Sequence, residues 1–185
     1  MKPDLTLDLA PIVPSLTLKS GNPLTAPVNV VVVGLTSDNK VSIYADSIPK
    51  AVATKIVAAL LAVGATGKKD EVTRIPAGSL ATADVIVAIG LGSEKTGFTP
   101  EQLRRAAGSA TRTLAGFKKV AIAITAVDAI QFGAILEGAA FGAYSFTAHL
   151  NATLKKAKSP VSSVAVFTSD SITAEYRQAH LRAQV

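Results

Sequence analysis

The sequence has 185 residues, a net charge of +6 and a hydrophobic fraction of 49%, which indicates a globular chain with its own core and excludes a disordered one. No apolar run approaches the roughly 18 residues of a membrane-spanning helix, and no signal-peptide stretch follows Met1, so we expect a cytoplasmic protein with no membrane partner. Cysteine is absent, which excludes disulfides and thiolate metal sites.

The N-terminal half of the sequence predicts strands and one helix. Residues 1–15 contain three prolines and no period, which predicts a loose arm, whereas residues 16–19 and 28–34 predict strands. We expect Asp46 or Ser47 to cap the helix that follows, and Gly64 to end it. Residues 71–75 and 85–89 predict two more strands. The core-facing stripe of the helix consists of Ile48, Val52, Ile56, Leu60 and Val63.

The second half continues the alternation of strands and helices. Thr99 and Gln102 form a capping box around Pro100, and Asp128 caps a long helix predicted to reach about Leu150. Strands are predicted at residues 120–124 and 163–167, and residues 173–185 have a helical pattern. This alternation predicts an α/β fold, namely a three-layer α/β/α sandwich with a mostly parallel mixed sheet.

The sequence offers no catalytic constellation. The two histidines, His149 and His180, are far apart, and the acidic residues are scattered, so we predict no catalytic and no metal-binding residue in this chain. One glycine-rich turn, residues 90–93, follows a buried strand, where backbone N–H groups can bind a phosphate. Lys95 replaces the last glycine of the dinucleotide-binding pattern, which favours an ordinary tight turn.

The predicted long helix contains three glycines, Gly133, Gly138 and Gly142. Because glycine inside a helix costs about 1 kcal/mol relative to alanine, their presence indicates the close approach of another backbone. The Gly138-x-x-x-Gly142 spacing resembles a membrane dimer motif, but the nearby Glu137 and Tyr144 favour packing of this helix on a sheet.

Most of the excess positive charge lies in the second half of the chain. Two interpretations stay open: these side chains neutralise helix ends, or they bind DNA weakly and without sequence preference. The candidate DNA-contact residues are Arg104, Arg105, Arg112, Lys118, Lys119, Lys155, Lys156 and Lys158.

One segment in the last third of the chain resembles a known family. Residues 137–146 read E-G-A-A-F-G-A-Y-S-F, similar to the E-G-x-x-L-G-x-Y-x-F stretch in the N-terminal domain of M17 leucyl aminopeptidases. Phe141 stands where that pattern has leucine. The segments 85–92 and 98–108 resemble the family in the same order, and the similarity covers roughly residues 28–185. The positions that match the motif are Glu137, Gly138, Gly142, Tyr144 and Phe146.

The resemblance implies a domain organisation. Residues 16–170 would form a macro-domain-like α/β domain, and residues 171–185 would begin the helix that leads to a catalytic domain absent from this sequence. That missing domain would hold two divalent metals, zinc or manganese, so this chain would bind no cofactor and have no peptidase activity. Its partners would be its own catalytic domain and neighbouring subunits of a homohexamer, with a role in assembly or regulation, and the isolated domain would be mainly monomeric.

Two alternatives remain beside this interpretation. The domain could be a DNA-binding module of the same enzyme, which predicts salt-dependent DNA affinity. It could instead be an independent macro-like domain that binds a nucleotide, which predicts stabilisation by ADP-ribose.

Overall fold

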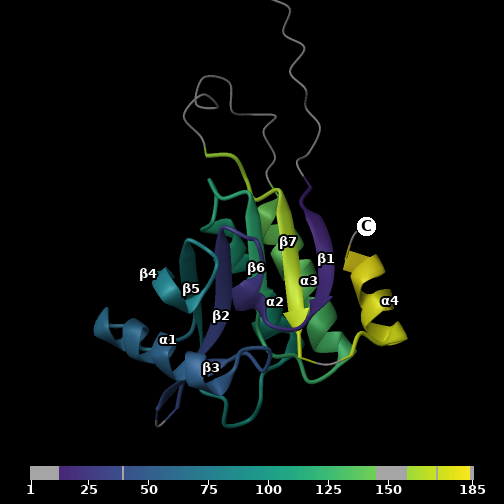
Figure 1. Cartoon of the computed structure of the whole chain (residues 1–185). Helices are drawn as coiled ribbons and strands as arrows, with labels where there is room; N and C mark the ends of the chain where they lie inside the picture. The colour runs from purple at the N-terminus through teal and green to yellow at the C-terminus, as the bar shows by residue number, and fades with distance from the viewer. Residues whose placement is uncertain (1–12, 39, 145–157, 170, 184–185) are drawn as a thin grey trace, which may run out of the picture.

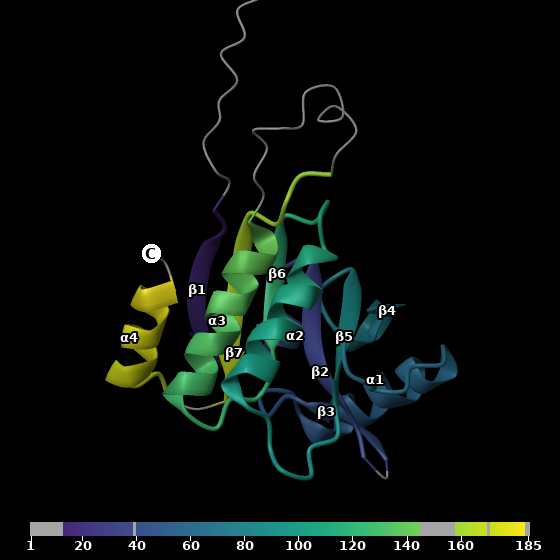
Figure 2. The same cartoon turned by 180° about the vertical axis from the view of Figure 1, so that it is seen from behind.

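The computed structural model describes residues 13–38, 40–144, 158–169 and 171–183. They form a seven-stranded mixed sheet with helices on both faces, which confirms the predicted α/β sandwich (Figure 1, Figure 2). No helix in these ranges is long and apolar enough to cross a membrane. The elements in chain order are β1 (Ser15–Ser20), η1 (Pro23–Thr25), β2 (Val30–Ser37), β3 (Val41–Tyr44), α1 (Lys50–Ala62), β4 (Val72–Pro76), η2 (Gly78–Leu80), β5 (Val85–Gly92), α2 (Pro100–Arg112), β6 (Lys119–Ala123), α3 (Ala129–Ala143), β7 (Ser163–Thr168) and α4 (Ala174–Ala183).

The sheet has the strand order β1-β7-β6-β2-β5-β4, and β3 pairs with the end of β2. Neighbours are parallel from β1 to β5, whereas β4 runs antiparallel to β5 and β3 antiparallel to β2. The first strand therefore pairs with the last one, with Ser15 opposite Ser163. The sequence predicted the parallel strands but neither β3 nor the antiparallel direction of β4.

The centre of the sheet is buried on both faces. Residues 30–33 of β2 are all valine with 0% exposure. Val30 and Val32 belong to the core cluster formed with α2 and α3, while Val31 and Val33 belong to the cluster formed with α1. A continuous β-branched run is typical of a strand covered on both sides, so this prediction is confirmed.

Helices α2 and α3 lie side by side on one face of the sheet (Figure 2). Both begin at the predicted caps. The Gln102 N–H donates to Thr99 Oγ1 at 3.3 Å, while the Thr99 N–H donates to Gln102 Oε1 at 2.8 Å, which completes the capping box. At the start of α3, the Gln131 N–H donates to Asp128 Oδ1 at 2.7 Å. These side chains accept hydrogen bonds from N–H groups in the first turn of each helix, which have no carbonyl partner within the helix.

The other face is covered by α1 and by the β1–β2 connection that contains η1 (Figure 1). The prediction that Asp46 or Ser47 caps α1 is wrong, because the helix begins at Lys50 after Pro49, and among the described residues no side chain caps it. The Asp46 N–H instead donates to Thr125 Oγ1 at 2.9 Å. Val63 lies past the end of α1 and is 58% exposed, so its predicted place in the core is also wrong.

The backbones of α2 and α3 approach each other closely where α3 has glycine. A Cβ added to Gly138 would lie 2.0 Å from the carbonyl oxygen of Arg104, and one added to Gly142 would lie 2.3 Å from that of Gly108. The prediction of a close backbone neighbour is therefore confirmed for these two glycines. That neighbour is a helix and not the sheet, which corrects the expected helix-on-sheet contact.

The third glycine of α3 has a different environment, and the helix is shorter than predicted. A Cβ at Gly133 would lie 3.4 Å from Cβ of Ala179 on α4, which is an ordinary contact. Tyr144 has the extended angles φ −62° and ψ 129°, so α3 ends at Ala143. The predicted unbroken run to Leu150 is therefore wrong, although residues 145–150 themselves lie outside the described part.

The loop between α1 and β4 is organised around the carboxylate of Glu71. Its Oε2 accepts hydrogen bonds from the Thr66 N–H at 3.0 Å, the Thr66 hydroxyl at 2.7 Å and the Lys68 N–H at 3.2 Å. Burial raises the pKa of Glu71, but the hydrogen bonds from Thr66, Lys68 and Gly67 outweigh it and hold the pKa below its ordinary 4.5. The ionised carboxylate therefore stabilises this loop.

Replacing Glu71 with glutamine is expected to lower the stability of the chain at neutral pH. Because the folded-state pKa is lowered, the stabilisation is fully present above the ordinary value of 4.5 and is lost as the pH falls through the lower folded-state pKa. The difference between parent and variant should thus shrink below about pH 4.5. Urea unfolding at several pH values measures it, and a difference that stays constant into acid would contradict this role.

Candidate functional site

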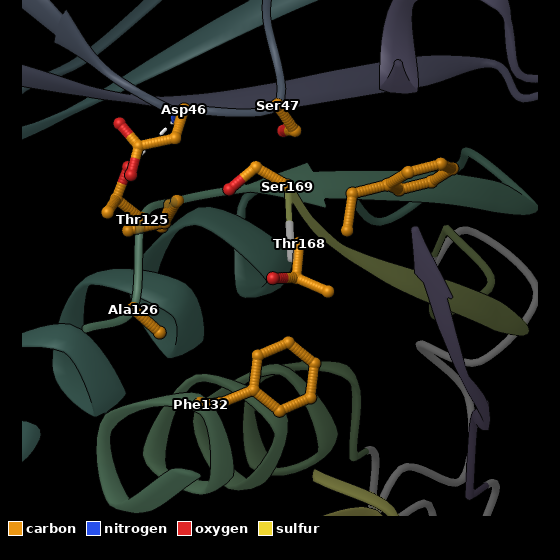
Figure 3. Close-up of a pocket in the computed structure, with 9 residues that line it drawn as sticks. Asp46, Ser47, Thr125, Ala126, Phe132, Thr168 and Ser169 are labelled. Carbon is orange, nitrogen blue, oxygen red and sulfur yellow. Dashed lines mark hydrogen bonds between the residues drawn. The ribbon is translucent and has the colours of Figure 1, made fainter. Parts of the chain in front are cut away.

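The crevice at the carboxyl ends of β6 and β7 is the place where α/β sheets ordinarily bind ligands. It lies against the connection between β3 and α1 (Figure 3). The hydroxyl groups of Thr168 and Ser169 point into it, and the ring of Phe132 closes it from the α3 side. The lining residues are Asp46, Ser47, Ile124, Thr125, Ala126, Phe132, Phe167, Thr168 and Ser169.

This crevice is very small. The space open to the centre of a water molecule is about 10 Å³, which is what a single water molecule requires. The hydrogen bond from the Asp46 N–H to Thr125 Oγ1 joins two of its walls. In the described conformation this crevice is therefore too small to hold a nucleotide.

The glycines predicted to form a turn after a strand instead continue β5 to Gly92, and the residues directly after the strand hold the carboxylate of Asp38. The Ser93 hydroxyl donates to Asp38 Oδ1, and the Glu94 N–H donates to Asp38 Oδ2 at 3.0 Å. The hydrogen bond from Ser93 contributes most to lowering the pKa of Asp38, and the one from the Glu94 N–H comes next. The positive charge of Lys95 lowers the pKa further, and together these effects outweigh desolvation, which raises it. The prediction of a tight turn at residues 90–93 is therefore wrong for Gly90 and Gly92, which pair with β2. The Glu94 N–H that follows the strand is already bonded within the chain.

The acidic residues and the histidine that the structure describes do not come together as a metal site. Within the described ranges no three His, Asp or Glu side chains are placed to hold a metal ion. His180 on α4 lies with Nε2 3.0 Å from the carbonyl oxygen of Leu16, so it ties α4 to β1. His149 lies outside the described residues.

Two of the candidate DNA-contact residues form ion pairs within the fold. Arg104 donates to Glu137 Oε2 at 2.9 Å and also to Glu101, and its pKa is raised chiefly by the bond to Glu137. Arg105 Nη2 lies 3.1 Å from Asp70 Oδ2. The charges of both arginines are therefore compensated locally, which the sequence spacing did not reveal.

Four other candidates lie at the amino-terminal end of the parallel strands. Arg112 and Lys158 line one pocket of about 170 Å³, and the Lys158 side chain lies against Gly116. Lys118 and Lys119 lie at the start of β6, where Lys119 lines a separate pocket together with Lys19, and all four candidates are exposed. We call Arg112, Lys118, Lys119 and Lys158 the basic edge. The remaining candidates, Lys155 and Lys156, lie outside the described residues.

The residues that match the family motif have mainly packing roles. Glu137 pairs with Arg104 across two helices, and Gly138 and Gly142 allow the close helix contact. Tyr144 ends α3 and is 47% exposed. Phe146 lies outside the described residues.

Sequence reasoning missed an exposed apolar surface on α3. Val127, Ile130, Phe141 and Tyr144 are 70%, 71%, 67% and 47% exposed, and we call them the α3 stripe. A signal was present in the sequence, because apolar residues surround this helix almost completely instead of lying on one side. A helix that is apolar all round is typical of one with partners on every side.

Comparison with known proteins gives one matching family model. The model described as "Cytosol aminopeptidase family, N-terminal domain" matches residues 32–153. A probable cytosol aminopeptidase of Streptomyces coelicolor is 47% identical over 117 residues, which cover 62% of this chain and 22% of that protein. Another from Streptomyces avermitilis is 39% identical over 165 residues, which cover 81% of this chain and 32% of that protein.

Solved structures show the same fold at low sequence identity. A tomato leucine aminopeptidase mutant matches with a TM-score of 0.69 and 14% identity, covering 92% of this chain and 35% of that one. The bottromycin maturation enzyme BotP in complex with Mn matches with a TM-score of 0.56 and 18% identity, covering 84% of this chain and 29% of that one. The chain thus spans about a fifth to a third of the length of these relatives.

Proposed function

The chain belongs to the cytosol aminopeptidase family as its N-terminal domain, and from this premise we propose that it is the non-catalytic part of a metal-dependent leucyl aminopeptidase. The observation that carries the proposal is the family match over residues 32–153 in a chain that spans only 22–32% of its curated relatives. The parent enzyme would release N-terminal amino acids from peptides in the cytoplasm.

The metal ions belong, in this proposal, to the rest of the parent protein. The described part of the chain gathers no three His, Asp or Glu side chains that fit a metal ion. The two divalent metals, zinc or manganese, would therefore be bound by the catalytic domain. No step of peptide hydrolysis is assigned to a residue of this chain.

The role proposed for this domain is to support assembly of the enzyme, a homohexamer. Two separate core clusters, one on each face of the sheet, give the domain a hydrophobic interior of its own. A domain with its own core can fold alone, so it can serve as a rigid unit between the catalytic domain and neighbouring subunits. By itself it would be mainly monomeric, because the catalytic domains would supply most of the subunit contacts.

We expect the purified 185-residue chain to leave a leucyl p-nitroanilide substrate unhydrolysed, with or without Mn²⁺ or Zn²⁺. The reason is that this chain contributes no metal-binding group among its described residues. The protein encoded by the natural reading frame beyond Val185 should hydrolyse the same substrate when the metal is added.

The control is a mock purification from the same host, which reveals contaminating peptidase. Metal-dependent turnover that follows the chain through each purification step would contradict the proposal. A reading frame that stops after Val185 would contradict the existence of the parent enzyme.

A second candidate function, DNA binding, is favoured by the basic edge. Four exposed cations at the amino-terminal end of the parallel strands can neutralise phosphates, whereas Arg104 and Arg105 are already paired. Aromatic side chains do not alternate with these cations in the sequence, so base stacking is not indicated. The competing explanation is that Arg112 and Lys158 neutralise the carboxyl ends of α2 and α3.

If the basic edge binds DNA, gel-shift titration at low salt should show weak binding without sequence preference. With four phosphates neutralised, the logarithm of the association constant should fall against that of the salt concentration with a slope of about −3.6. Lys118→Glu combined with Lys119→Glu should abolish the shift, whereas Arg105→Gln, the matched control, should preserve it. Absence of any shift, or equal binding by the double variant, would rule out this function.

A further inference from the structure

A groove lies along α3, where this helix is placed between α2 and α4 (Figure 2). Its floor is apolar and includes Ala129, Gly133 and Ala134 of α3 and Ala179 of α4. Because none of these side chains is larger than a methyl group, the groove stays open, with a volume of about 340 Å³. Pockets that bind small molecules ordinarily measure about 300–1,000 Å³, so the groove can hold a small ligand.

Helix α4 presents two unpaired charges of opposite sign to this groove. Glu175, Gln178 and Arg182 all line it, and their spacing of three and four residues places them on one side of the helix. Within the part of the chain that the structure describes, neither Glu175 nor Arg182 forms an ion pair or a side-chain hydrogen bond. One end of this wall is therefore negative and the other positive, and both charges can bind a ligand.

The opposite wall carries charges that are already paired. Arg104 Nε of α2 donates to Glu137 Oε2 of α3 at 2.9 Å, and both side chains line the groove. The two cations and two anions of the lining, Arg104, Arg182, Glu137 and Glu175, sum to zero net charge. A simple anion or cation is thus not favoured over the other, whereas a ligand with one charge of each sign can bind Glu175 and Arg182 together.

The separation of the two unpaired charges determines the length of such a ligand. Seven residues separate Glu175 from Arg182, which corresponds to about 10 Å along the helix. A free amino acid carries its ammonium and carboxylate groups on one carbon atom, whereas an extended chain of two or three residues spans roughly 7–10 Å. Gln178 lies between the two charges, and its side-chain amide can both donate to and accept from a peptide group.

We propose that this groove binds a short peptide of two or three residues with free amino and carboxyl ends. The ammonium group binds Glu175, the carboxylate binds Arg182, and an apolar side chain packs on the floor at Gly133 and Ala134. The inference goes beyond the proposed function, because it concerns binding and assigns no hydrolysis to this chain.

Titration of the isotope-labelled 185-residue chain with the dipeptide leucyl-leucine, followed by NMR, tests the proposal. We expect saturable shifts of the Gly133 and Ala179 amide signals, with a dissociation constant on the order of 1 mM. Glu175→Gln and Arg182→Gln should each weaken binding about three- to fivefold, as the loss of an exposed ion pair does. Arg177→Gln is the matched control, because this exposed cation of α4 lines a different pocket, and it should leave the affinity unchanged.

Dipeptides blocked at one end assign each charge to its residue. Leucyl-leucine amide lacks the carboxylate, so it should bind the parent chain about three- to fivefold more weakly than the free dipeptide does. In Arg182→Gln the amide and the free dipeptide should bind equally well, because the interaction between that residue and the carboxylate is already lost. Acetyl-leucyl-leucine, which lacks the ammonium group, should show the same relation to Glu175→Gln.

Three outcomes would overturn the inference. Shifts that do not saturate up to about 20 mM would show that the groove binds no peptide. Blocked dipeptides that bind the parent chain as tightly as the free one would leave Glu175 and Arg182 as charges that only stabilise the ends of α4. Equal binding of free leucine would contradict the ligand length. None of these results bears on the proposed function, which the activity of the longer natural protein tests.

Discussion

Replacing Gly138 with alanine is expected to destabilise the chain by about 2–3 kcal/mol, although alanine is the better helix former. The added Cβ would lie 2.0 Å from the carbonyl oxygen of Arg104, and this oxygen belongs to the backbone of α2 and cannot rotate away. The two helices would have to separate along their whole contact. Gly142→Ala should behave in the same way, because its Cβ would lie 2.3 Å from the carbonyl oxygen of Gly108.

The same helix provides a matched control. At Gly133 the added Cβ would lie 3.4 Å from Cβ of Ala179, an ordinary van der Waals distance. Gly133→Ala should therefore stabilise the chain by up to about 1 kcal/mol through its higher helix propensity. Urea unfolding followed by circular dichroism compares the variants. Opposite signs for Gly138→Ala and Gly133→Ala are the expected result, and equal signs would show that the close helix contact is absent in solution.

Gly90→Ala in β5 should have a comparable effect, a loss of about 3 kcal/mol, through a different contact. A Cβ at this position would lie 1.8 Å from the carbonyl oxygen of Lys68. Two backbone hydrogen bonds hold the loop that contains Lys68 against β5. The Gly90 N–H donates to the backbone carbonyl oxygen of Glu71 at 2.7 Å, and the Asp70 N–H donates to the backbone carbonyl oxygen of Gly90 at 2.9 Å. Alanine would push this loop away and break these bonds, together with the Asp70–Arg105 ion pair.

Gly97→Ala is the control for this prediction. Gly97 has φ +73° and no neighbouring atom within 4 Å of the added Cβ, so alanine costs only the backbone strain of about 1–2 kcal/mol. Amide hydrogen exchange should show that Gly90→Ala, and not Gly97→Ala, exposes the Asp70 N–H. Unchanged protection of Asp70 in Gly90→Ala would mean that the loop absorbs the extra methyl group.

The parts of the fold that depend on local residue patterns were predictable from the sequence. Thr99 and Asp128 cap their helices because a short polar side chain directly before the first turn reaches free N–H groups. The cap predicted for α1 failed because the helix begins at Lys50, after Pro49, so the side chain of Ser47 lies too early in the chain to occupy the capping position. Local pattern gives the residue type of a cap but not the position at which the tertiary fold starts the helix.

Features that depend on contacts between distant parts of the sequence were harder to predict. The partner of Gly138 is the backbone of α2, and no local pattern tells a helix partner from a sheet partner. The pairing of Arg105 with Asp70 joins residues 35 positions apart, so spacing along α2 alone suggested a free cation. The exposure of the α3 stripe was missed for a related reason. Apolar residues are ordinarily assigned to the core, and only the folded structure shows which side of α3 faces it.

The pairing of β1 with β7 has a consequence for synthesis in the cell. Ser15 pairs opposite Ser163, so β1 leaves the ribosome long before its partner exists. At about 5–20 residues per second, this delay amounts to roughly 7–30 s. During that time β1 is an unpaired strand that other nascent chains can bind. The sheet is therefore completed last at its β1 end, and aggregation during translation competes most directly with this late step.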